Sequence, residues 1–336
     1  MFRIAILSYW HVHAKDYIRE ANSHPDAEIV ACWDEVPERG RSEAERRGIS
    51  FHEDLDELLA REDVDGVVVT TPTVAHRELI PTVAAAGKHV FAEKVIAPTK
   101  QQAEQVIAAT EREGVTFVVS LPKLYAGYTK AIKQTINEGL LGEVTYLRVR
   151  VSHDGALSTE ENPKGWLPER FFDPEEAAGG VTIDFGAHPL YLVRHFLGMA
   201  EEVSATYGRF TDRVVEDNAV VTLGFRTGAI GVAEASFVGV ASRFIIEAHG
   251  TEGSLLYGPP DQQLRLRRMG GGQWQTLNLS PDDPTPFERW VELARRGQPD
   301  RNNVRAALDL SALAEAANLS AASGRPVRLG ETRERG

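Results

Sequence analysis

The chain has 336 residues, of which 42% are hydrophobic and 26% are charged, and its formal net charge is −12. A chain of this length usually divides into two domains, and the composition is typical of a soluble globular protein. The acidic balance argues against a nucleic-acid-binding protein, which needs a basic face. No apolar stretch approaches the roughly 20 residues of a membrane-spanning helix, so we expect no membrane partner.

The N-terminal segment lacks the basic leader and the small-residue cleavage site of a signal peptide. Its apolar run predicts a first β-strand instead, and a cytoplasmic location is expected by default. The single cysteine, Cys32, lies in an apolar run and is expected to be a small core residue.

The first third of the chain alternates short β-rich runs with amphipathic helical stretches, which predicts parallel strands joined by crossover helices. The expected strands are 3–7, 28–34, 66–71, 89–93 and 116–121, and the expected helices are 13–23, 37–47, 55–61, 76–86 and 99–113. We therefore expect an α/β, Rossmann-type domain with a doubly wound parallel sheet over residues 1–122. Ligands of such sheets bind beyond the carboxyl ends of the strands.

The pattern changes after residue 122, where strand-like runs follow one another with turns between them. Helices are expected at 127–138, 180–197, 286–296 and 303–323, and strands at 143–151, 202–210, 218–225, 230–237, 243–249, 254–257, 263–268 and in the closing PVRL segment. Runs of strands separated by turns pair as a mostly antiparallel sheet. Residues 123–336 are therefore expected to form an α+β domain, and we take it as the candidate domain for substrate binding and oligomerisation.

The loop after the first expected strand does not carry the G-x-G-x-x-G fingerprint that lets a backbone approach a pyrophosphate. It contains no glycine, and its cofactor-binding candidates are Ser8, Trp10, His11, Val12 and His13. Backbone N–H groups at a helix start can face an anion, and either histidine can add a donor. The bulk of Trp10 opposes close approach, so the alternative is a nucleotide-type domain whose first loop does not bind in the standard way.

Asp34 ends the second expected strand, where a carboxylate can accept hydrogen bonds from the ribose hydroxyls of a dinucleotide. A carboxylate there repels a 2′-phosphate, so NAD is expected as the cofactor rather than NADP. Asp34 is equally compatible with capping the helix that is expected at Pro37. The third strand runs into Thr71 and Pro72, with His76 in the next helix, and these three residues are further cofactor-binding candidates.

The fourth expected strand ends in Glu93-Lys94 after an apolar run. A lysine at this edge can stabilise negative charge that develops on oxygen in a transition state, provided that water is excluded. The alternative is a solvated lysine at a strand end, which is the commoner situation for any single lysine. We take both residues as cofactor-binding candidates and Lys94 as a catalytic candidate.

Asp184 and His188 are four residues apart in a stretch that is expected to be helical, so their side chains would share one helix face. A histidine beside a carboxylate is a common acid–base pair because imidazole titrates near neutral pH. The spacing also suits a plain hydrogen-bonded pair or two metal ligands, and with His11 and His13 a metal hydrolase is a competing class. No H-E-x-x-H motif or cysteine cluster supports that class, so no metal ligands are expected.

The order of these motifs resembles the glucose–fructose oxidoreductase, inositol dehydrogenase and MocA (Gfo/Idh/MocA) family. The motifs are TTP with His76, then Glu93-Lys94, then Gly-Gly followed by D-x-G-x-H. The resemblance covers nearly the whole chain, including the closing GRPVRL segment. It implies a Rossmann domain and a second domain built on an open, mainly antiparallel sheet. Val95 stands where the family has a proline after the Glu-Lys pair.

The resemblance also implies a chemistry, which is hydride transfer between the carbon of a sugar or polyol hydroxyl and nicotinamide C4. By resemblance, Lys94 would lie by the nicotinamide and stabilise the substrate oxygen, His188 would accept the hydroxyl proton, and Asp184 would orient the histidine and the substrate. The expected enzyme is an NAD(P)-dependent oxidoreductase acting on CH–OH groups. The glycine-free first loop is its main departure from the family pattern.

Polar residues near the expected domain junction are candidates for substrate binding: Lys123, Tyr125, His153, Lys164 and Trp166. An aromatic ring near a cation suits stacking on a sugar, although each of these residues is more often plain surface or core. The expected partner is a small carbohydrate-like molecule, with no nucleic acid. An exposed sheet face would favour a homodimer or homotetramer.

Two other functions are compatible with the same residues. Some relatives oxidise a sugar transiently, eliminate a group and reduce the product, which gives net glycoside hydrolysis with a retained NAD. A non-catalytic relative with a degraded cofactor loop would bind a metabolite without binding NAD. An NAD titration and a stoichiometry assay separate these alternatives.

Overall fold

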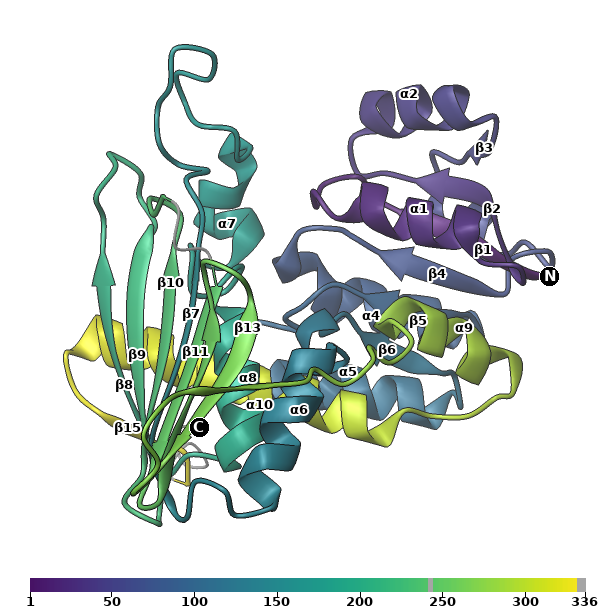
Figure 1. Ribbon diagram of the computed structural model, residues 1–336. Helices are drawn as coiled ribbons and strands as arrows, with labels where there is room; N and C mark the ends of the chain where they lie inside the picture. Colours follow the sequence, from purple (N-terminus) through teal and green to yellow (C-terminus); the bar gives the residue numbers. More distant parts are fainter. Residues whose placement is uncertain (241–243, 331–336) are drawn as a thin grey trace. The chain divides into compact units, whose positions relative to one another are not determined.

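The computed structural model describes residues 1–240 and 244–330, and it divides into two compact units (Figure 1). One unit comprises Met1–Leu121 with Pro284–Leu308, and the other comprises Pro122–Asp283 with the chain from Asp309 onward. The sequence division placed all of 123–336 in the second domain, whereas Pro284–Leu308 packs with the first unit. Each unit is described by itself below.

The first unit contains a six-stranded sheet in which all neighbouring strands are parallel. Its strands are β1 (Phe2–Leu7), β2 (Ala27–Trp33), β3 (Ser50–Phe51), β4 (Gly66–Val69), β5 (His89–Ala92) and β6 (Phe117–Val119). The spatial order β3-β2-β1-β4-β5-β6 is that of a doubly wound Rossmann sheet, as expected from the sequence. The two-residue β3 was not predicted, because so short a strand has no periodicity to detect.

The helices of this unit include one from the C-terminal part of the chain. They are α1 (Ala14–Ser23), α2 (Pro37–Arg47), α3 (Leu55–Leu59), α4 (His76–Ala85), α5 (Lys100–Arg112) and α9 (Pro286–Arg295). The apolar face of α9 carries Phe287, Trp290, Val291 and Ala294, spaced as one helix stripe, and it joins the core that also contains Phe2. Burial of this stripe explains why α9 belongs to the first unit.

The second unit contains a nine-stranded sheet that is antiparallel except where β7 pairs with β10. Its strands are β7 (Val144–Ser152), β8 (Glu202–Gly208), β9 (Asn218–Gly224), β10 (Ile230–Ser236), β11 (Phe244–Gly250), β12 (Gly253–Gly258), β13 (Gln263–Arg268), β14 (Gln275–Leu277) and β15 (Val327–Arg328). The expected strand 243–249 begins at a residue outside the described ones, and β14 was not predicted.

Helices of the second unit pack on one face of this sheet. They are α6 (Gly127–Asn137), α7 (Pro174–Ala177), α8 (Ala187–Leu197) and α10 (Arg301–Ser323), whose first residues belong to the other unit. Helix α8 packs on β7 and β10. Along β9, buried Ala219, Val221 and Leu223 alternate with exposed Val220 and Thr222, so the opposite face of the sheet is open.

The expected helix 180–197 is too long at its N-terminal end, because α8 begins only at Ala187. Residues 181–186 form successive turns in which the N–H of Gly186 bonds to the carbonyl of Val181. The hydrogen-bond spacing is wider than that of an α-helix, and the glycines in this stretch have low helix propensity.

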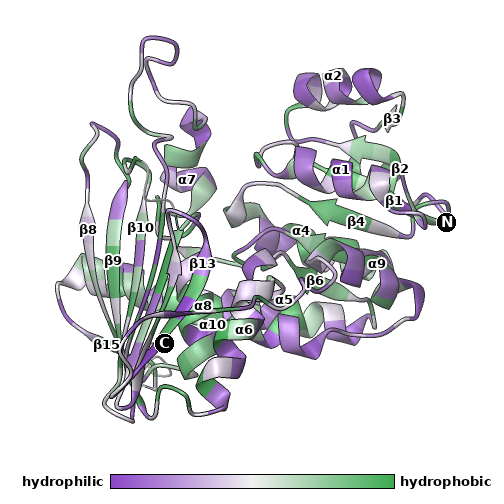
Figure 2. Cartoon of the chain, in the orientation of Figure 1, coloured by the Kyte–Doolittle hydropathy of each residue, from purple (hydrophilic) through white to green (hydrophobic). Residues whose placement is uncertain are grey.

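The hydropathy of the residues follows their burial, as strand β4 illustrates. Figure 2 shows most of β4 coloured as hydrophobic, and all four of its residues are buried.

Among residues 1–240 and 244–330, no helix combines the length and the apolarity that crossing a bilayer requires.

Candidate functional site

The glycine-free first loop is a closed turn held by its own hydrogen bonds. Ser8 has a positive φ of 77°, the conformation that glycine usually supplies, and its side chain is fully buried. Ser8 Oγ accepts the N–H of Trp10 at 2.9 Å, and its carbonyl accepts the Thr70 hydroxyl at 2.5 Å. The N–H of His11 donates to the Thr70 carbonyl at 3.0 Å. The loop is therefore fixed to the end of β4 without any glycine.

Asp34 directly follows β2 and is 1% exposed, and N–H donors already surround its carboxylate. It accepts the backbone N–H groups of Tyr9 and Val36, both at 2.8 Å. The Arg39 guanidinium binds it in a bidentate manner, with Nε 2.9 Å from Oδ2 and Nη2 2.7 Å from Oδ1. Glu35 and Arg39 were not among the sequence candidates, although Arg39 lies in the first turn of the helix that Asp34 precedes.

Glu93 follows β5 and forms a buried polar cluster with two histidines of the first loop. His11 Nδ1 lies 3.6 Å from Glu93 Oε1, and the His11 and His13 ring centroids are 5.0 Å apart. The Tyr17 hydroxyl donates to the same oxygen. Burial alone would raise the pKa of Glu93, but the charges of His11, Lys94 and His13 outweigh it and lower that pKa. Tyr17, four residues after His13 on α1, was missed by the sequence analysis.

Thr71, Pro72 and His76 are all buried beside this cluster. His76 Nδ1 lies 3.0 Å from the Val95 carbonyl, so this nitrogen carries the hydrogen and donates it. His76 Nε2 and Thr71 Oγ1 are buried atoms with no hydrogen-bond partner among the described residues. Burial lowers the pKa of His76, while the charge of Glu93 opposes that shift.

Lys94 is 4% exposed, so it is not the solvated lysine that its sequence position also allowed. Its backbone N–H donates to Glu93 Oε2 at 3.1 Å, and the Lys94–Val95 peptide bond is cis. A buried ammonium group is costly unless it meets negative charge or polar groups, which is the situation of a lysine that works on a ligand.

In the second unit, a buried carboxylate fixes the turn that precedes α8. Glu216 accepts the N–H groups of Gly180 and Thr182 at 3.2 and 3.0 Å. A Cβ on Gly180 would lie 2.2 Å from the Glu216 carbonyl oxygen, so only glycine fits there. This contact explains the second glycine of the Gly-Gly sequence by packing. Asp184 lies in the turn, half-buried, three residues before the start of α8 rather than on its face.

His188 lies in the first turn of α8, is 7% exposed, and has a fixed orientation. Its Nδ1 is 2.8 Å from the hydroxyl of Tyr191, three residues further along the helix. That hydroxyl accepts the backbone N–H of Lys123 at 3.1 Å. Tyr191 was missed by the sequence analysis, although its i+3 spacing from His188 on a helix predicts such a contact.

Three rings gather around His153, which follows the end of β7. Its ring centroid lies 4.7 Å from those of Trp166 and Phe185, and 4.9 Å from that of Phe237. Phe185 is in turn 5.7 Å from His188. We call His153, Trp166, Phe185 and Phe237 the ring cluster. Trp166 is 50% exposed, so the cluster offers a partly solvent-accessible aromatic surface.

The remaining substrate candidates are Lys123, Tyr125 and Lys164. The Lys123 ammonium lies 4.5 Å from the Phe244 ring centroid, and burial lowers its pKa to about 8. Tyr125 is half-buried, and its carbonyl accepts the N–H of Asp283. Lys164 has an exposed side chain, and its carbonyl accepts a hydrogen bond from Arg213.

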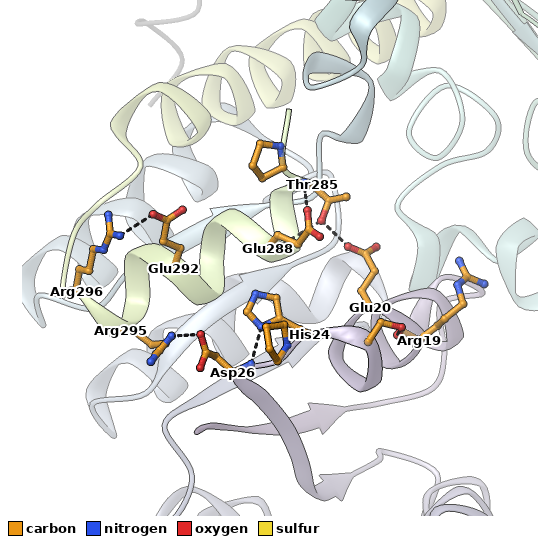
Figure 3. A pocket seen from close by; sticks show the side chains of 12 residues that line it. Arg19, Glu20, His24, Asp26, Thr285, Glu288, Glu292, Arg295 and Arg296 are labelled. Atoms are coloured by element: carbon orange, nitrogen blue, oxygen red, sulfur yellow. Dashed lines mark hydrogen bonds and ion pairs between the residues drawn. The ribbon is translucent and has the colours of Figure 1, made fainter. Parts of the chain in front are cut away.

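An open groove of about 860 Å³ lies along α1 and α9 in the first unit (Figure 3). Its charged residues pair with each other, as Arg295 does with Asp26 and Arg296 with Glu292. The Thr285 hydroxyl donates to Glu20 at 2.5 Å. None of the site residues predicted from the sequence lines the groove. Because its charged residues pair with one another, we assign no ligand to it.

Two family models match the chain, one for each expected domain. Residues 2–121 match the model described as "Oxidoreductase family, NAD-binding Rossmann fold", and residues 129–256 match the "GFO/IDH/MocA C-terminal domain". Together these segments span most of the chain.

Individual proteins agree with these matches. The 1,5-anhydro-D-fructose reductase of Ensifer adhaerens is 30% identical over 247 residues, 72% of each chain, and the D-apiose dehydrogenase of Paraburkholderia graminis is 28% identical over 90% of this chain and 83% of its own. The crystal structure of an oxidoreductase from Desulfitobacterium hafniense has the same fold, with a TM-score of 0.85 and 21% identity over 99% of both chains. Some solved structures of similar fold are complexes with NAD, and others are complexes with NADP.

Proposed function

This chain is a member of the Gfo/Idh/MocA oxidoreductase family, and on that premise we propose that it transfers a hydride between nicotinamide and a hydroxyl-bearing carbon of a sugar, cyclitol or polyol. The family assignment covers the oxidoreductase class and the Rossmann domain that binds the dinucleotide. The roles of individual residues below are part of the proposal.

The burial of the Lys94 side chain is the observation that carries this proposal. A lysine in a water-poor site at the carboxyl edge of a parallel sheet is placed to stabilise charge on a substrate oxygen. Thr71 Oγ1, buried at the same edge without a partner among the described residues, fits a site in which a bound molecule supplies the missing hydrogen bond.

The first-loop residues Ser8, Trp10, His11, Val12 and His13, together with Thr71, Pro72, His76 and Glu93, would hold the dinucleotide. Asp34 would act there mainly through Arg39, since its carboxylate already accepts N–H groups from three residues. NAD is the proposed cofactor because the nearby carboxylates Asp34 and Glu35 repel a 2′-phosphate. When bound, the nicotinamide supplies the hydride acceptor or donor at C4.

In the direction of oxidation, His188 accepts the proton of the substrate hydroxyl on Nε2 while Nδ1 donates its hydrogen to Tyr191. The carbon gives up a hydride, which is one proton with two electrons, and becomes a carbonyl carbon. The hydroxyl proton leaves separately and goes to His188. Lys94 stabilises the negative charge that develops on the oxygen, and Asp184 orients the histidine and the substrate. We assign the proton acceptor to a histidine because imidazole exchanges protons near neutral pH.

The ring cluster is the proposed surface for the carbohydrate. Sugar C–H faces pack on aromatic rings, and polar groups at the ring edges can bond hydroxyls. Trp166 exposes half of its surface, and its Nε1 donates to Asp154 at 3.0 Å, which fixes the indole. Lys123, Tyr125 and Lys164 would contribute polar contacts.

Assembly into a homodimer or homotetramer is proposed from the open face of the nine-stranded sheet. On this sheet Arg148 pairs with Glu234 at 2.7 Å and with Glu247 at 2.9 Å, so the strands carry charged groups as well as exposed apolar side chains such as Val220. Homo-oligomers commonly use such self-complementary surfaces. A cytoplasmic location remains a prediction from the sequence.

The proposal is tested by supplying NAD⁺ and a panel of sugars, cyclitols and polyols while the formation of NADH and of carbonyl product is followed. We expect at least one compound to give NADH and ketone or aldehyde in equal amounts. Turnover that consumes no added NAD⁺ and releases a free sugar from a glycoside would contradict net oxidation. No turnover together with no dinucleotide binding would contradict the proposal entirely.

A further inference from the structure

The side chains of His11, His13 and Glu93 form a cluster of possible metal ligands that dinucleotide binding does not require. One side-chain nitrogen or oxygen from each of the three residues lies within 4.8 Å of the others. His11 and Glu93 are buried, and His13 is half-buried at the rim. Two imidazoles and a carboxylate are a common donor set for divalent transition-metal ions.

The closest atoms in the cluster are His11 Nδ1 and Glu93 Oε1, 3.6 Å apart. The backbone N–H of His13 donates to His11 Nδ1 at 3.2 Å, so in this arrangement that nitrogen has no hydrogen of its own. That lone pair accepts the His13 N–H, and it belongs to the His11 atom that lies close to the buried carboxylate, so a metal ion bound at Nδ1 would replace this hydrogen bond. Tetrahedral zinc ligands lie about 3.4 Å from each other, so a cation between these atoms needs only a small movement.

Residues around the cluster orient it as outer partners orient metal ligands. His13 Nδ1 lies 2.9 Å from Asp16 Oδ2, which leaves Nε2 of His13 for a ligand. The Tyr17 hydroxyl donates to Glu93 and lies 2.8 Å from Ser120 Oγ. A carboxylate on the far nitrogen of a metal-binding histidine fixes the ring and raises its basicity.

His76 provides an independent observation beside the cluster. Its Nδ1 hydrogen bonds to the Val95 carbonyl, and its buried Nε2 makes no hydrogen bond of normal geometry to the described residues, although the Thr71 backbone also acts on the pKa of this ring. The charges of His11 and Glu93 both act on His76. A cation nearby would provide an interaction for a buried nitrogen that lacks a normal hydrogen bond among the described residues.

We propose that His11, His13 and Glu93 bind a divalent transition-metal ion of the zinc class at the first loop. Three protein ligands leave a coordination position open for water or for an oxygen of a bound molecule. The site would place positive charge where the loop lacks the glycine-rich backbone that usually meets a phosphate. This proposal does not depend on hydride transfer, because metal binding is measured without dinucleotide or substrate.

The competing explanation is a proton instead of a metal ion, with a charged His11 paired to Glu93. The two explanations differ in whether added metal binds. The test uses the full-length chain without an affinity tag, stripped with a chelator and titrated with Zn²⁺ by calorimetry and with Co²⁺ by visible absorption. Three variants accompany it: His13→Gln, Asp16→Asn, and His24→Gln as a histidine control outside the cluster.

We expect one ion per chain and Co²⁺ bands typical of nitrogen and oxygen ligands. His13→Gln should weaken Zn²⁺ binding by at least about 100-fold, and Asp16→Asn by about 10- to 100-fold, since outer partners of metal ligands have effects of that size. His24→Gln should leave the affinity unchanged. Because the His13 side chain is 44% exposed, its replacement is compatible with folding, which circular dichroism checks.

Absence of binding at millimolar Zn²⁺ would overturn the proposal and leave the proton explanation. Binding that His13→Gln and Asp16→Asn do not weaken would overturn it too, because the ion would then bind elsewhere. A chain that binds metal but no NAD would support this site and contradict the proposed function, and the reverse result would do the opposite.

Discussion

The first loop of the Rossmann unit and the ring cluster of the second unit represent two ways of building a binding surface. Around the first loop, charged and polar groups are buried and bonded to one another, as Asp34 is to Arg39 and Glu93 to Tyr17. In the ring cluster, the contacts are between aromatic faces, and polar atoms such as Nε1 of Trp166 lie at the ring edges.

The difference indicates what each surface can recognise. Buried charges in a low-dielectric environment interact strongly with charged ligands, but they are costly when left unpaired. Aromatic faces bury area without demanding charge, which suits the neutral ring of a sugar. A cofactor with phosphates, or a cation, therefore belongs with the first loop, and a carbohydrate with the ring cluster.

The largest expected effect comes from removing the proposed base in the second unit. His188→Gln should lower kcat by about 10²- to 10⁴-fold, the usual contribution of a positioned general base. Binding of NAD to the first unit should be unchanged, which a calorimetric titration checks. If turnover persists at the wild-type rate, His188 is not the base, and the chemistry does not lie where the ring cluster meets α8.

A comparable change in the first unit is Lys94→Ala. We expect kcat to fall by about 10²- to 10³-fold, as for the loss of a single group that stabilises an oxyanion. The exposed Lys15 on α1 provides the matched control, and Lys15→Ala should have wild-type kinetics. Full activity of Lys94→Ala would show that the buried lysine has no catalytic role, and the proposed function would lose its main support.

Asp34→Ala tests whether this carboxylate acts on the cofactor or only on the loop. The change frees the Arg39 guanidinium, which can then accept a 2′-phosphate, so the preference for NAD over NADP should narrow by about tenfold. It should also lower the free energy of unfolding by about 3 kcal/mol, because a buried ion pair loses one partner. Arg39→Ala should shift the preference in the opposite direction.

If Asp34→Ala loses stability but keeps the wild-type preference for NAD over NADP, the role of Asp34 is to stabilise the first loop and not to select the cofactor. The kinetics of both cofactors and chemical denaturation of the same preparation give the two readings. A change in the ratio without a loss of stability would contradict the hydrogen-bond arrangement around Asp34.

The smallest effect is expected from Lys123, whose pKa burial lowers from 10.5 to about 8. Between these values the unfolded chain binds a proton that the folded chain lacks, so wild-type stability should rise with pH through this range. Below pH 8 the charged amine should destabilise the fold, and Lys123→Met should be more stable there by about 1–2 kcal/mol. The difference should vanish near pH 10.5. Denaturation at both pH values checks this, and a constant difference would contradict it.

The sequence predicted the Rossmann sheet well because short apolar strands that alternate with amphipathic helices carry a strong signal. Strand β5 and helix α2 were predicted to within a residue of their observed ends. Arg39 was missed although its partner Asp34 lies only five residues earlier in the chain. Tyr17 was missed because its partner Glu93 follows another element, and contacts across a fold leave no local pattern. The same is true of Pro284–Leu308, whose apolar face gave no indication of which sheet it covers.

The candidate site was predicted less completely than the fold. Glu93 and Lys94 were recognised as a charged pair after an apolar strand, but their burial depends on packing that the sequence does not display. The Gly179-Gly180 pair belonged to a motif, and only the structure connects it to the buried Glu216. Asp184 and His188 were expected on one helix face, whereas the turn held by Glu216 leaves Asp184 outside α8.

The most direct test of the account is a titration of the purified, tag-free chain with NAD⁺, NADH and NADP⁺, after any nucleotide that co-purifies has been identified. The account predicts one dinucleotide per chain, with micromolar or tighter affinity and a preference for NAD. Binding of neither cofactor at millimolar concentration would contradict hydride transfer by this chain, whatever its second unit binds.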